Sequence, residues 1–119
     1  MYLKEFITKM NTTKDTVRFY LELSLLTPIR KGKNYWFTDN EVESFLEIKN
    51  LQELGFSLKE ICAIKELHDQ SCGTKKQHEQ NLRLIEEKIA ENDAAIRELR
   101  HRKKALVALK KALKKLLIK

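Results

Sequence analysis

Residues 13–20 combine cationic, hydroxyl and aromatic side chains that suit binding to an anion. Lys14 and Arg18 are four residues apart and share one helix face, while Val17 and Leu21 share another. A recognition helix presents such cations, hydroxyls and rings to the phosphates and base edges of the DNA major groove. An ordinary amphipathic helix with a solvated charged face is an equal alternative for this segment alone. The candidate contact residues here are Thr13, Lys14, Thr16, Arg18 and Phe19.

A second basic and aromatic cluster follows the single proline. Lys31 and Lys33 flank a glycine, and Tyr35 and Trp36 continue in a β-prone run. We interpret this stretch as a short hairpin, or wing, whose basic tip approaches the DNA backbone. The alternative is a plain surface loop, and in either case Phe37 is expected to enter the core.

The sequence contains no pattern that indicates a catalytic site or a metal-binding site. It contains no nucleophile–base pairing, phosphate-cradling glycine loop or metal-ligand spacing, so we expect neither an enzyme nor a metal or other cofactor. Cys62 is expected to be a small core residue. Cys72 precedes Lys75 and Lys76 near a helix start, where a thiolate is favoured, and is the candidate signal-sensing residue. A purely structural Cys72 and a thiophilic-metal ligand are the alternatives.

The net charge of +7 is divided unevenly along the chain. Residues 1–37 carry seven Lys/Arg against three Asp/Glu, residues 38–98 carry eight against fourteen, and residues 99–119 carry nine against none. Two basic segments therefore flank an acidic middle and need separate explanations. For the amphipathic tail we favour packing against the acidic middle of a partner subunit over contact with DNA or a membrane surface.

The composition favours helices joined by short turns, since the chain has only three glycines and one proline. The two cysteines form no paired framework, and the first residues lack a signal-peptide core. No apolar run approaches the ~20 residues of a membrane-spanning helix. We therefore expect a cytoplasmic protein that has no membrane partner, and DNA binding would make it nucleoid-associated.

Helix starts are marked by a repeated pattern of Ser or Thr followed three residues later by an acid or Gln. Such capping boxes satisfy the orphan amides of a first helical turn. The four matches are Thr12–Asp15, Thr38–Glu41, Ser57–Glu60 and Thr74–Gln77. Together with the apolar spacing, they predict helices over residues 3–10, 13–23, 39–54, 58–67 and 74–116. In the third of these helices Val42, Phe45, Leu46 and Leu51 form the predicted apolar set.

The last helix carries an apolar seam with alternating spacings of three and four. Lys103 interrupts this register, and the seam then resumes in a shifted phase. A helix of about 65 Å with such a stripe needs a partner, and self-association is the leading interpretation. The predicted dimerisation residues are Leu82, Ile85, Ile89, Asn92, Ile96, Leu99, Leu106, Leu109 and Leu113, with Leu116 continuing the seam.

The order of these pieces resembles the MerR family of bacterial transcriptional regulators. That family shows segments like T-L-R-Y-Y, G-L-L, N-G-Y-R-x-Y and L-x-x-L-G-F-S-L-x-E-I. The matching stretches here are Thr16–Tyr20 (TVRFY), Ser24–Leu26 (SLL), Asn34–Phe37 (NYWF) and Leu51–Ile61 (LQELGFSLKEI). The resemblance covers roughly residues 2–68.

The resemblance implies a mainly α fold with two parts. Residues 1–70 form a winged helix-turn-helix DNA-binding domain, and residues 71–119 form a linker and a dimerisation helix paired as an antiparallel coiled coil. It also implies that Arg18, Phe19 and Tyr20 contact DNA. Phe19 stands where the family usually has tyrosine, so it packs without hydrogen-bonding a phosphate.

The wing departs from the family pattern as well. Trp36 stands in place of the usual arginine, and Lys31 or Lys33 is expected to substitute for its backbone contact. The implied function is that of a homodimeric regulator that binds an inverted-repeat promoter operator. It would distort double-stranded DNA so that RNA polymerase holoenzyme engages an overlong spacer, in response to an unknown small effector. The rival hypothesis is a coiled-coil protein–protein interaction module whose head binds no specific DNA.

Overall fold

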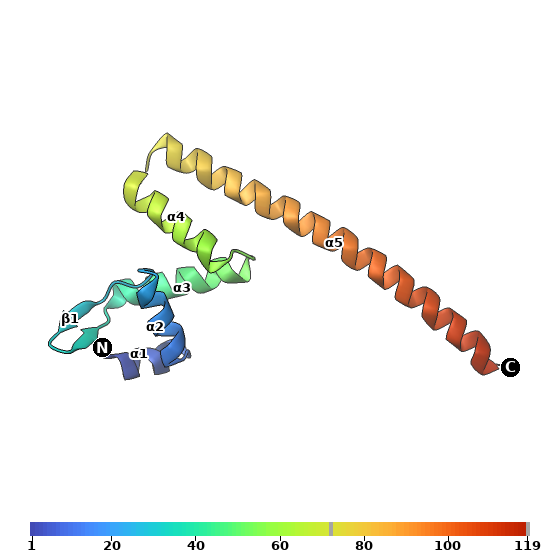
Figure 1. The fold of residues 1–119 in the computed structure, drawn as a ribbon, viewed down its shortest axis with the longest axis horizontal. Helices are drawn as coiled ribbons and strands as arrows, with labels where there is room; N and C mark the ends of the chain where they lie inside the picture. Colours follow the sequence, from blue (N-terminus) through green and yellow to red (C-terminus); the bar gives the residue numbers. More distant parts are fainter. Residues whose placement is uncertain (72, 119) are drawn as a thin grey trace. The chain divides into compact units, whose positions relative to one another are not determined.

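The computed structural model describes residues 1–71 and 73–118, and the chain divides into the units Met1–Gln77 and His78–Lys119. We call the first unit the head. The fold is mainly helical, as the sequence predicted, and its only sheet among the described residues is the two-stranded wing. The elements are α1 (Leu3–Met10), α2 (Lys14–Glu22), β1 (Ile29–Lys31), β2 (Asn34–Trp36), α3 (Asp39–Glu53), α4 (Leu58–Ser71) and α5 (Lys75–Ile118) (Figure 1).

A tight turn joins α1 and α2 into a helix-turn-helix. Asn11 ends α1 in the left-handed conformation, with φ 52° and ψ 52°, which asparagine tolerates better than most residues. The Thr12 amide still donates to Ile7 O, so Thr13 is the extended residue that caps α2, and its Oγ1 accepts from the Thr16 amide at 3.2 Å. The capping box predicted at Thr12–Asp15 is therefore wrong by one residue, because Thr12 belongs to the end of α1.

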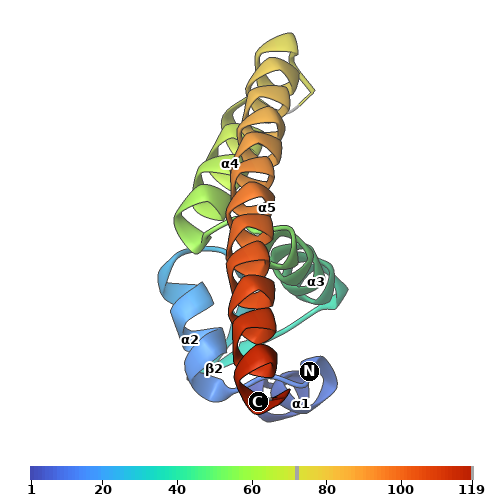
Figure 2. The same cartoon turned by 90° about the vertical axis from the view of Figure 1, so that its right-hand side faces the viewer.

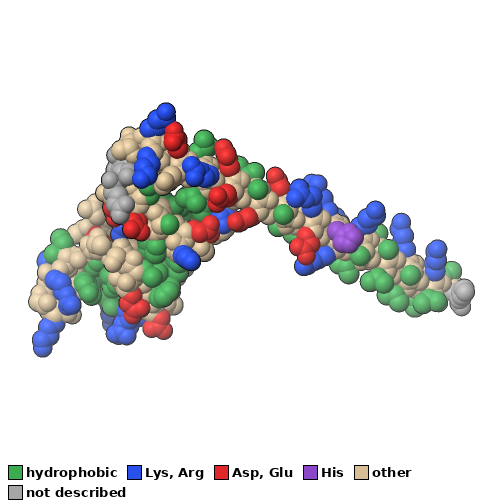
Figure 3. All heavy atoms as spheres, turned by 45° about the horizontal axis from the view of Figure 1, so that its top comes forward, with side chains coloured by type: hydrophobic (Ala, Val, Ile, Leu, Met, Phe, Trp, Pro, Cys, Tyr) green, Lys and Arg blue, Asp and Glu red, His purple; other side chains and the backbone are tan. Residues whose placement is uncertain are grey.

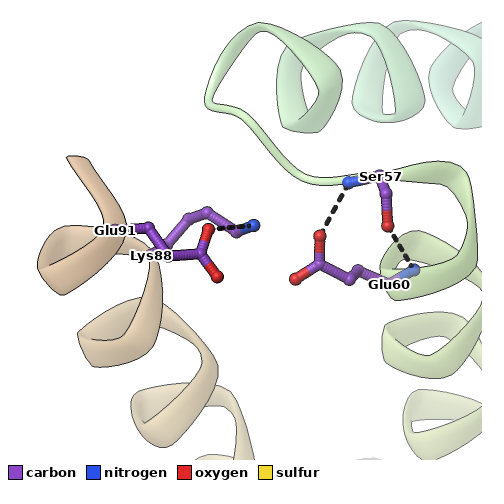
Figure 4. Close-up of polar contacts among 4 residues, drawn as sticks. All are labelled: Ser57, Glu60, Lys88 and Glu91. Atoms are coloured by element: carbon purple, nitrogen blue, oxygen red, sulfur yellow. Dashed lines mark hydrogen bonds and ion pairs between the residues drawn. The ribbon is translucent and has the colours of Figure 1, made fainter. Parts of the chain in front are cut away.

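Two of the other predicted capping boxes begin α3 and α4. The Ser57 amide donates to Glu60 Oε1 at 2.9 Å, and the Glu60 amide donates back to Ser57 Oγ at 3.1 Å (Figure 4). At the start of α3, the Thr38 amide donates to Glu41 Oε2 at 3.2 Å. These local bonds satisfy backbone donors that a helix start leaves unpaired.

The start of α5 is capped in a related way. The Gln77 amide donates to Thr74 Oγ1 at 3.2 Å, while Gln77 Oε1 accepts from the Gly73 amide at 2.6 Å, one residue earlier than in a standard box. The Gln77 amide group also lies 3.2 Å from His68 Nδ1. Gln77 is thus the buried polar residue that ends the head.

An aromatic cluster forms the centre of the head. Phe6 stacks on Phe37 with centroids 4.4 Å apart and meets Phe45 edge to face at 5.8 Å. The Tyr20 ring lies 5.7 Å from Phe45, and its hydroxyl donates to Gln52 Oε1 at 3.0 Å. Phe37 is buried, as predicted. The other buried apolar residues are Val17, Leu25, Leu26, Ile48, Phe56 and Ile61.

Two core predictions are wrong. Leu46 is 57% exposed, because α3 buries Phe45 and Ile48, and the ~100° turn per residue carries Leu46 to the outside. Cys62 is half-buried instead of fully enclosed, since its neighbour Ile61 takes the inward position on α4. That helix also continues to Ser71, beyond the predicted end at residue 67.

The wing is an antiparallel hairpin with Ile29 opposite Trp36 and Lys31 opposite Asn34. Its two-residue turn begins at Gly32, whose φ of +64° suits a hairpin turn and is disfavoured for residues with a Cβ. Helix α1 contacts both α2 and β2, and these elements lie side by side in both ribbon views (Figures 1 and 2). The hairpin therefore has a fixed neighbour in α1.

Helix α5 is a continuous helix of 44 residues, or about 66 Å at 1.5 Å per residue. An ion pair within the helix joins Lys88 to Glu91 at 2.9 Å (Figure 4). A second joins Arg102 to Glu98 at 2.8 Å. In the described part of the chain, no helix has the length and apolar character needed to cross a membrane. Towards its C-terminal end α5 shows Lys and Arg along one edge and hydrophobic side chains along the other (Figure 3).

Replacing Phe6 by alanine tests the role of the aromatic cluster. Since Phe6 is fully buried between Phe37 and Phe45, Phe6→Ala should lower the free energy of unfolding of the head by about 3–5 kcal/mol. Urea unfolding followed by the fluorescence of Trp36, the single tryptophan, measures this change. Phe19→Ala, at an exposed position, is the matched control and should cost less than about 0.5 kcal/mol. Equal costs for the two variants would contradict the assigned core.

Candidate nucleic-acid interface

A groove of about 640 Å³ lies between α1, α2 and the hairpin. Four cationic side chains line it, two from α2 and one each from α1 and the hairpin turn, and apolar side chains of α1 and α2 lie between them. The lining residues are Tyr2, Leu3, Lys4, Ile7, Lys14, Arg18, Leu21, Lys33, Asn34 and Tyr35. The fold thus brings Lys14, Arg18, Lys33 and Tyr35, predicted from separate segments, to one concave surface.

Helix α2 presents Arg18 and Phe19 to solvent because its other face is committed to the core. Val17 and Tyr20 are buried at 0% and 2% exposure, and the two residues between them must then point outward. Phe19 is 46% exposed, which is unusual for a phenylalanine ring in a small helical domain. An exposed ring beside an arginine is suited to packing on a sugar or a thymine methyl group.

The first turn of α2 supplies hydroxyls and backbone amides. Thr13 and Lys14 are exposed and Thr16 is half-buried. The Thr13 hydroxyl donates to Thr16 Oγ1 at 2.8 Å, so the two side chains are oriented together at the helix start. Amides at a helix N-terminus carry partial positive charge and attract anions such as phosphate.

Tyr20 does not belong to this surface, and its predicted contact with DNA is wrong. Its ring is buried against Phe45, and its hydroxyl is bonded to Gln52 Oε1, so neither is accessible. Only the first member of the aromatic pair in TVRFY, Phe19, faces solvent. The second, Tyr20, attaches α2 to α3.

The wing is stiffened by cation–π contacts. Lys31 Nζ lies 3.7 Å from the centroid of the Trp36 ring, and the Tyr2 ring meets Trp36 edge to face at 5.0 Å. On the neighbouring pair of strand residues, Arg30 lies 4.6 Å from the Tyr35 centroid. Each such contact contributes about 0.5–1 kcal/mol at an exposed site. Trp36 is therefore held by two neighbours, while Lys33 at the turn lines the groove.

One cationic residue of the groove, Lys4, was not predicted from the sequence, whereas Arg30 belongs to the basic stretch of the predicted wing. Lys4 lines the groove from α1, and Arg30 covers Tyr35 and donates from Nη1 to Lys33 O at 3.3 Å. Lys4 lies 29 positions before Lys33, and no local pattern indicates that α1 and the hairpin meet.

The predicted dimerisation residues all lie on α5 and are exposed in the single chain. Their apolar members range from 44% exposure at Ile96 to 64% at Leu106. The predicted sensing residue, Cys72, lies outside the described residues. Among the residues that the structure does describe, no group of three His, Cys, Asp or Glu side chains could hold a metal ion.

Two family models match the chain. The model described as MerR HTH family regulatory protein matches residues 1–67, which include the helix-turn-helix, the hairpin and the groove. The model described as MerR, DNA binding matches residues 46–109. A comparison with curated proteins gives no match. The first model alone covers more than half of the 119 residues, and the resemblance inferred from the sequence is confirmed. The chain therefore belongs to the MerR family, whose members are DNA-binding transcription regulators and not enzymes.

Proposed function

We propose that this MerR-family regulator binds an inverted-repeat operator as a homodimer, with one groove-bearing head on each half-site. The observation that carries the proposal is the convergence of Lys4, Lys14, Arg18 and Lys33 on one groove beside the exposed Phe19. Phosphate contacts supply most of the affinity of such a surface, and contacts to base edges supply its specificity. Two heads are needed because an inverted repeat has twofold symmetry.

Within each head, α2 enters the major groove. Arg18 donates to base edges or phosphates, and Phe19 packs against a sugar or a thymine methyl group. The first-turn residues Thr13, Lys14 and Thr16 contact the adjoining backbone, with the helix N-terminus adding its positive partial charge. Exposure of Arg18 and Phe19 and the orientation of the Thr13 hydroxyl support these roles.

The wing contacts the DNA backbone at the side of α2. Lys33 lines the same groove as Arg18, and Lys31 lies over the half-buried ring of Trp36. A charge that rests on a fixed ring loses little conformational freedom when it meets a phosphate. Lys31 and Lys33 therefore replace the arginine that the family usually carries in its wing, while Trp36 orients Lys31 and Tyr35 holds Arg30 beside them.

The homodimer forms through α5, which pairs with its copy as an antiparallel coiled coil. Exposed leucines and isoleucines along most of this helix support a partner, since monomers rarely leave so long an apolar stripe in water. In the family's mechanism the bound dimer distorts the promoter, so that RNA polymerase holoenzyme engages an overlong spacer. Sequence-dependent stiffness of the operator then adds to its recognition. Such a protein acts at the nucleoid, in response to an effector for which Cys72 is the candidate sensor.

Three substitutions on α2 test the recognition helix. Arg18→Ala should weaken operator binding about tenfold or more, because it removes a charged hydrogen-bond donor. Phe19→Tyr should preserve or raise affinity, since the added hydroxyl can bond a phosphate. Tyr20→Phe is the control and should leave affinity unchanged, because its hydroxyl bonds Gln52 inside the head. Fluorescence anisotropy on a duplex identified by footprinting upstream of the protein's own gene measures all three. The proposal would be contradicted if Arg18→Ala bound the operator as tightly as the original protein, or if the original protein bound random DNA as tightly as the operator.

A lysine pair on α1 tests whether the groove meets phosphates. Lys4 lines the groove and Lys9 does not. Lys4→Ala should weaken binding to all duplexes by a similar factor and reduce the slope of log K against log salt by about 1.8 for a dimer, at ~0.9 per phosphate contact. Lys9→Ala should leave the slope unchanged. A titration between low and moderate salt with both variants decides the matter, and identical slopes would exclude Lys4 from the interface.

A further inference from the structure

The apolar stripe of α5 has the same spacing in both directions from Leu99. Going backwards from Leu99, its members are Ile96, Asn92, Ile89, Ile85 and Leu82, at steps of three, four, three, four and three. Going forwards, the same steps reach Arg102, Leu106, Leu109, Leu113 and Leu116. The sequence of steps is thus the same in both directions from Leu99, so the whole stripe from Leu82 to Leu116 matches itself when the second copy is reversed about this residue.

We propose that two copies of α5 pair antiparallel about a twofold axis at Leu99. The proposal rests on the homodimer of the proposed function and specifies its register. Each stripe residue then faces a stripe residue of the other copy. The pairs are Leu82 with the partner's Leu116, Ile85 with the partner's Leu113, Ile89 with the partner's Leu109, Asn92 with the partner's Leu106, Ile96 with the partner's Arg102, and Leu99 with the partner's Leu99.

Burial favours this register over its closest competitor. The competing axis lies between residues 90 and 91 and matches Leu82 with the partner's Leu99. It covers the stripe only from Leu82 to Leu99 and leaves Leu106, Leu109 and Leu113, each more than 60% exposed, without a seam residue opposite. The axis at Leu99 covers the stripe over its whole length, and apolar area removed from water is the main driving force of association.

The charges beside the stripe favour the same register. In an antiparallel pair, the residues that immediately follow the second apolar position of each heptad face one another across the seam. With the axis at Leu99, the exposed Asp93 faces the partner's Lys103, and the exposed Glu86 faces the partner's Lys110. Each pair occurs twice because of the twofold symmetry.

The competing arrangements bring like charges together. An axis between residues 90 and 91 places Glu86 opposite the partner's Asp93, and both are carboxylates. A parallel pair places the nine Lys/Arg of residues 99–119 beside the same nine of the other copy. Like charges facing one another are destabilising.

The residues on the other side of the stripe, and Arg102 as the single cation within it, are also consistent with the axis at Leu99. Ala95 faces the partner's Ala105 there, and small side chains allow the two backbones to approach closely. Arg102 takes the place that mirrors Ile96, but its Nη2 donates to Glu98 Oε1 at 2.8 Å. This bond holds the guanidinium at the rim, so that the methylene groups of Arg102 cover the apolar neighbour.

Charge reversal on the full chain distinguishes the registers. With the axis at Leu99, Asp93→Lys opposes the partner's Lys103 at two symmetric sites and should raise the dimer Kd about 10- to 30-fold. The double variant D93K/K103D restores opposite charges and should return the Kd to within about threefold of the original. Sedimentation equilibrium measures each Kd. In the competing register, Asp93→Lys meets the partner's Glu86 and tightens the dimer.

The outcomes separate this proposal from the proposed function. If the chain is monomeric at all concentrations, the homodimer of the proposed function is itself contradicted. A dimer that tightens with Asp93→Lys, or that the double variant does not rescue, retains the homodimer and overturns the axis at Leu99.

A cysteine at the axis provides an independent test. In the full chain with Cys62 and Cys72 changed to alanine, Leu99→Cys should form a disulfide between subunits on mild oxidation, because residue 99 meets its own copy. Ile96→Cys is the matched control, and its thiol lies about 9 Å along the helix from the thiol of the other copy. Equal crosslinking of both variants, or none with Leu99→Cys in a sample that sediments as a dimer, would contradict the proposed register.

Discussion

The stacking of Phe6 on Phe37, with ring centroids 4.4 Å apart, is the contact on which the candidate DNA-binding surface depends. Phe6 comes from α1, Phe37 follows β2, and the edge contact with Phe45 adds α3 to the same cluster. Each aromatic pair contributes about 0.5–1.5 kcal/mol beyond the burial of its area. Because α1 and the hairpin are two of the three elements that line the groove, this stacking holds the elements that carry Lys4 and Lys33 together.

The same core decides which face α2 presents. With successive residues about 100° apart, a helix that buries Val17 and Tyr20 must expose Arg18 and Phe19. The hydrogen bond from the Tyr20 hydroxyl to Gln52 adds a polar constraint on the rotation of the helix, because a buried hydroxyl without a partner is costly. The arginine is therefore positioned by its buried neighbours and not by bonds of its own.

Local patterns in the sequence predicted most of the fold. Helix α1 begins and ends at the predicted residues, and the boxes at Ser57 and Thr38 form because their bonds join residues three apart. The errors concern which face of a helix is buried, rather than which residues form a helix or a strand. Tyr20 was assigned to the surface and Leu46 to the core, since the pattern shows an apolar residue but not which neighbouring helix covers it.

The candidate site was predictable only in part for the same reason. Lys14 and Arg18 were found because they share one face of one helix, and Lys33 because it sits at a recognisable hairpin turn. The place of Lys4 in the groove could not be predicted without knowing that α1 and β2 are neighbours, because that contact belongs to the tertiary structure. The residue spacing within α2 and the hairpin does not indicate that a lysine of α1 completes the groove.

The division of charge along α5 has a physical consequence for assembly. All Asp and Glu of this helix precede Leu99, whereas the residues after it carry only basic charges. Residues 75–98 carry six Asp/Glu against five Lys/Arg, so a reversed copy places the basic half of α5 beside a nearly neutral half, whereas a parallel copy places the two basic halves together. The net charge of +7 therefore comes from residues 75–119, which carry fourteen Lys/Arg against six Asp/Glu, whereas residues 1–74 carry ten against eleven and gather four of their cations around the groove.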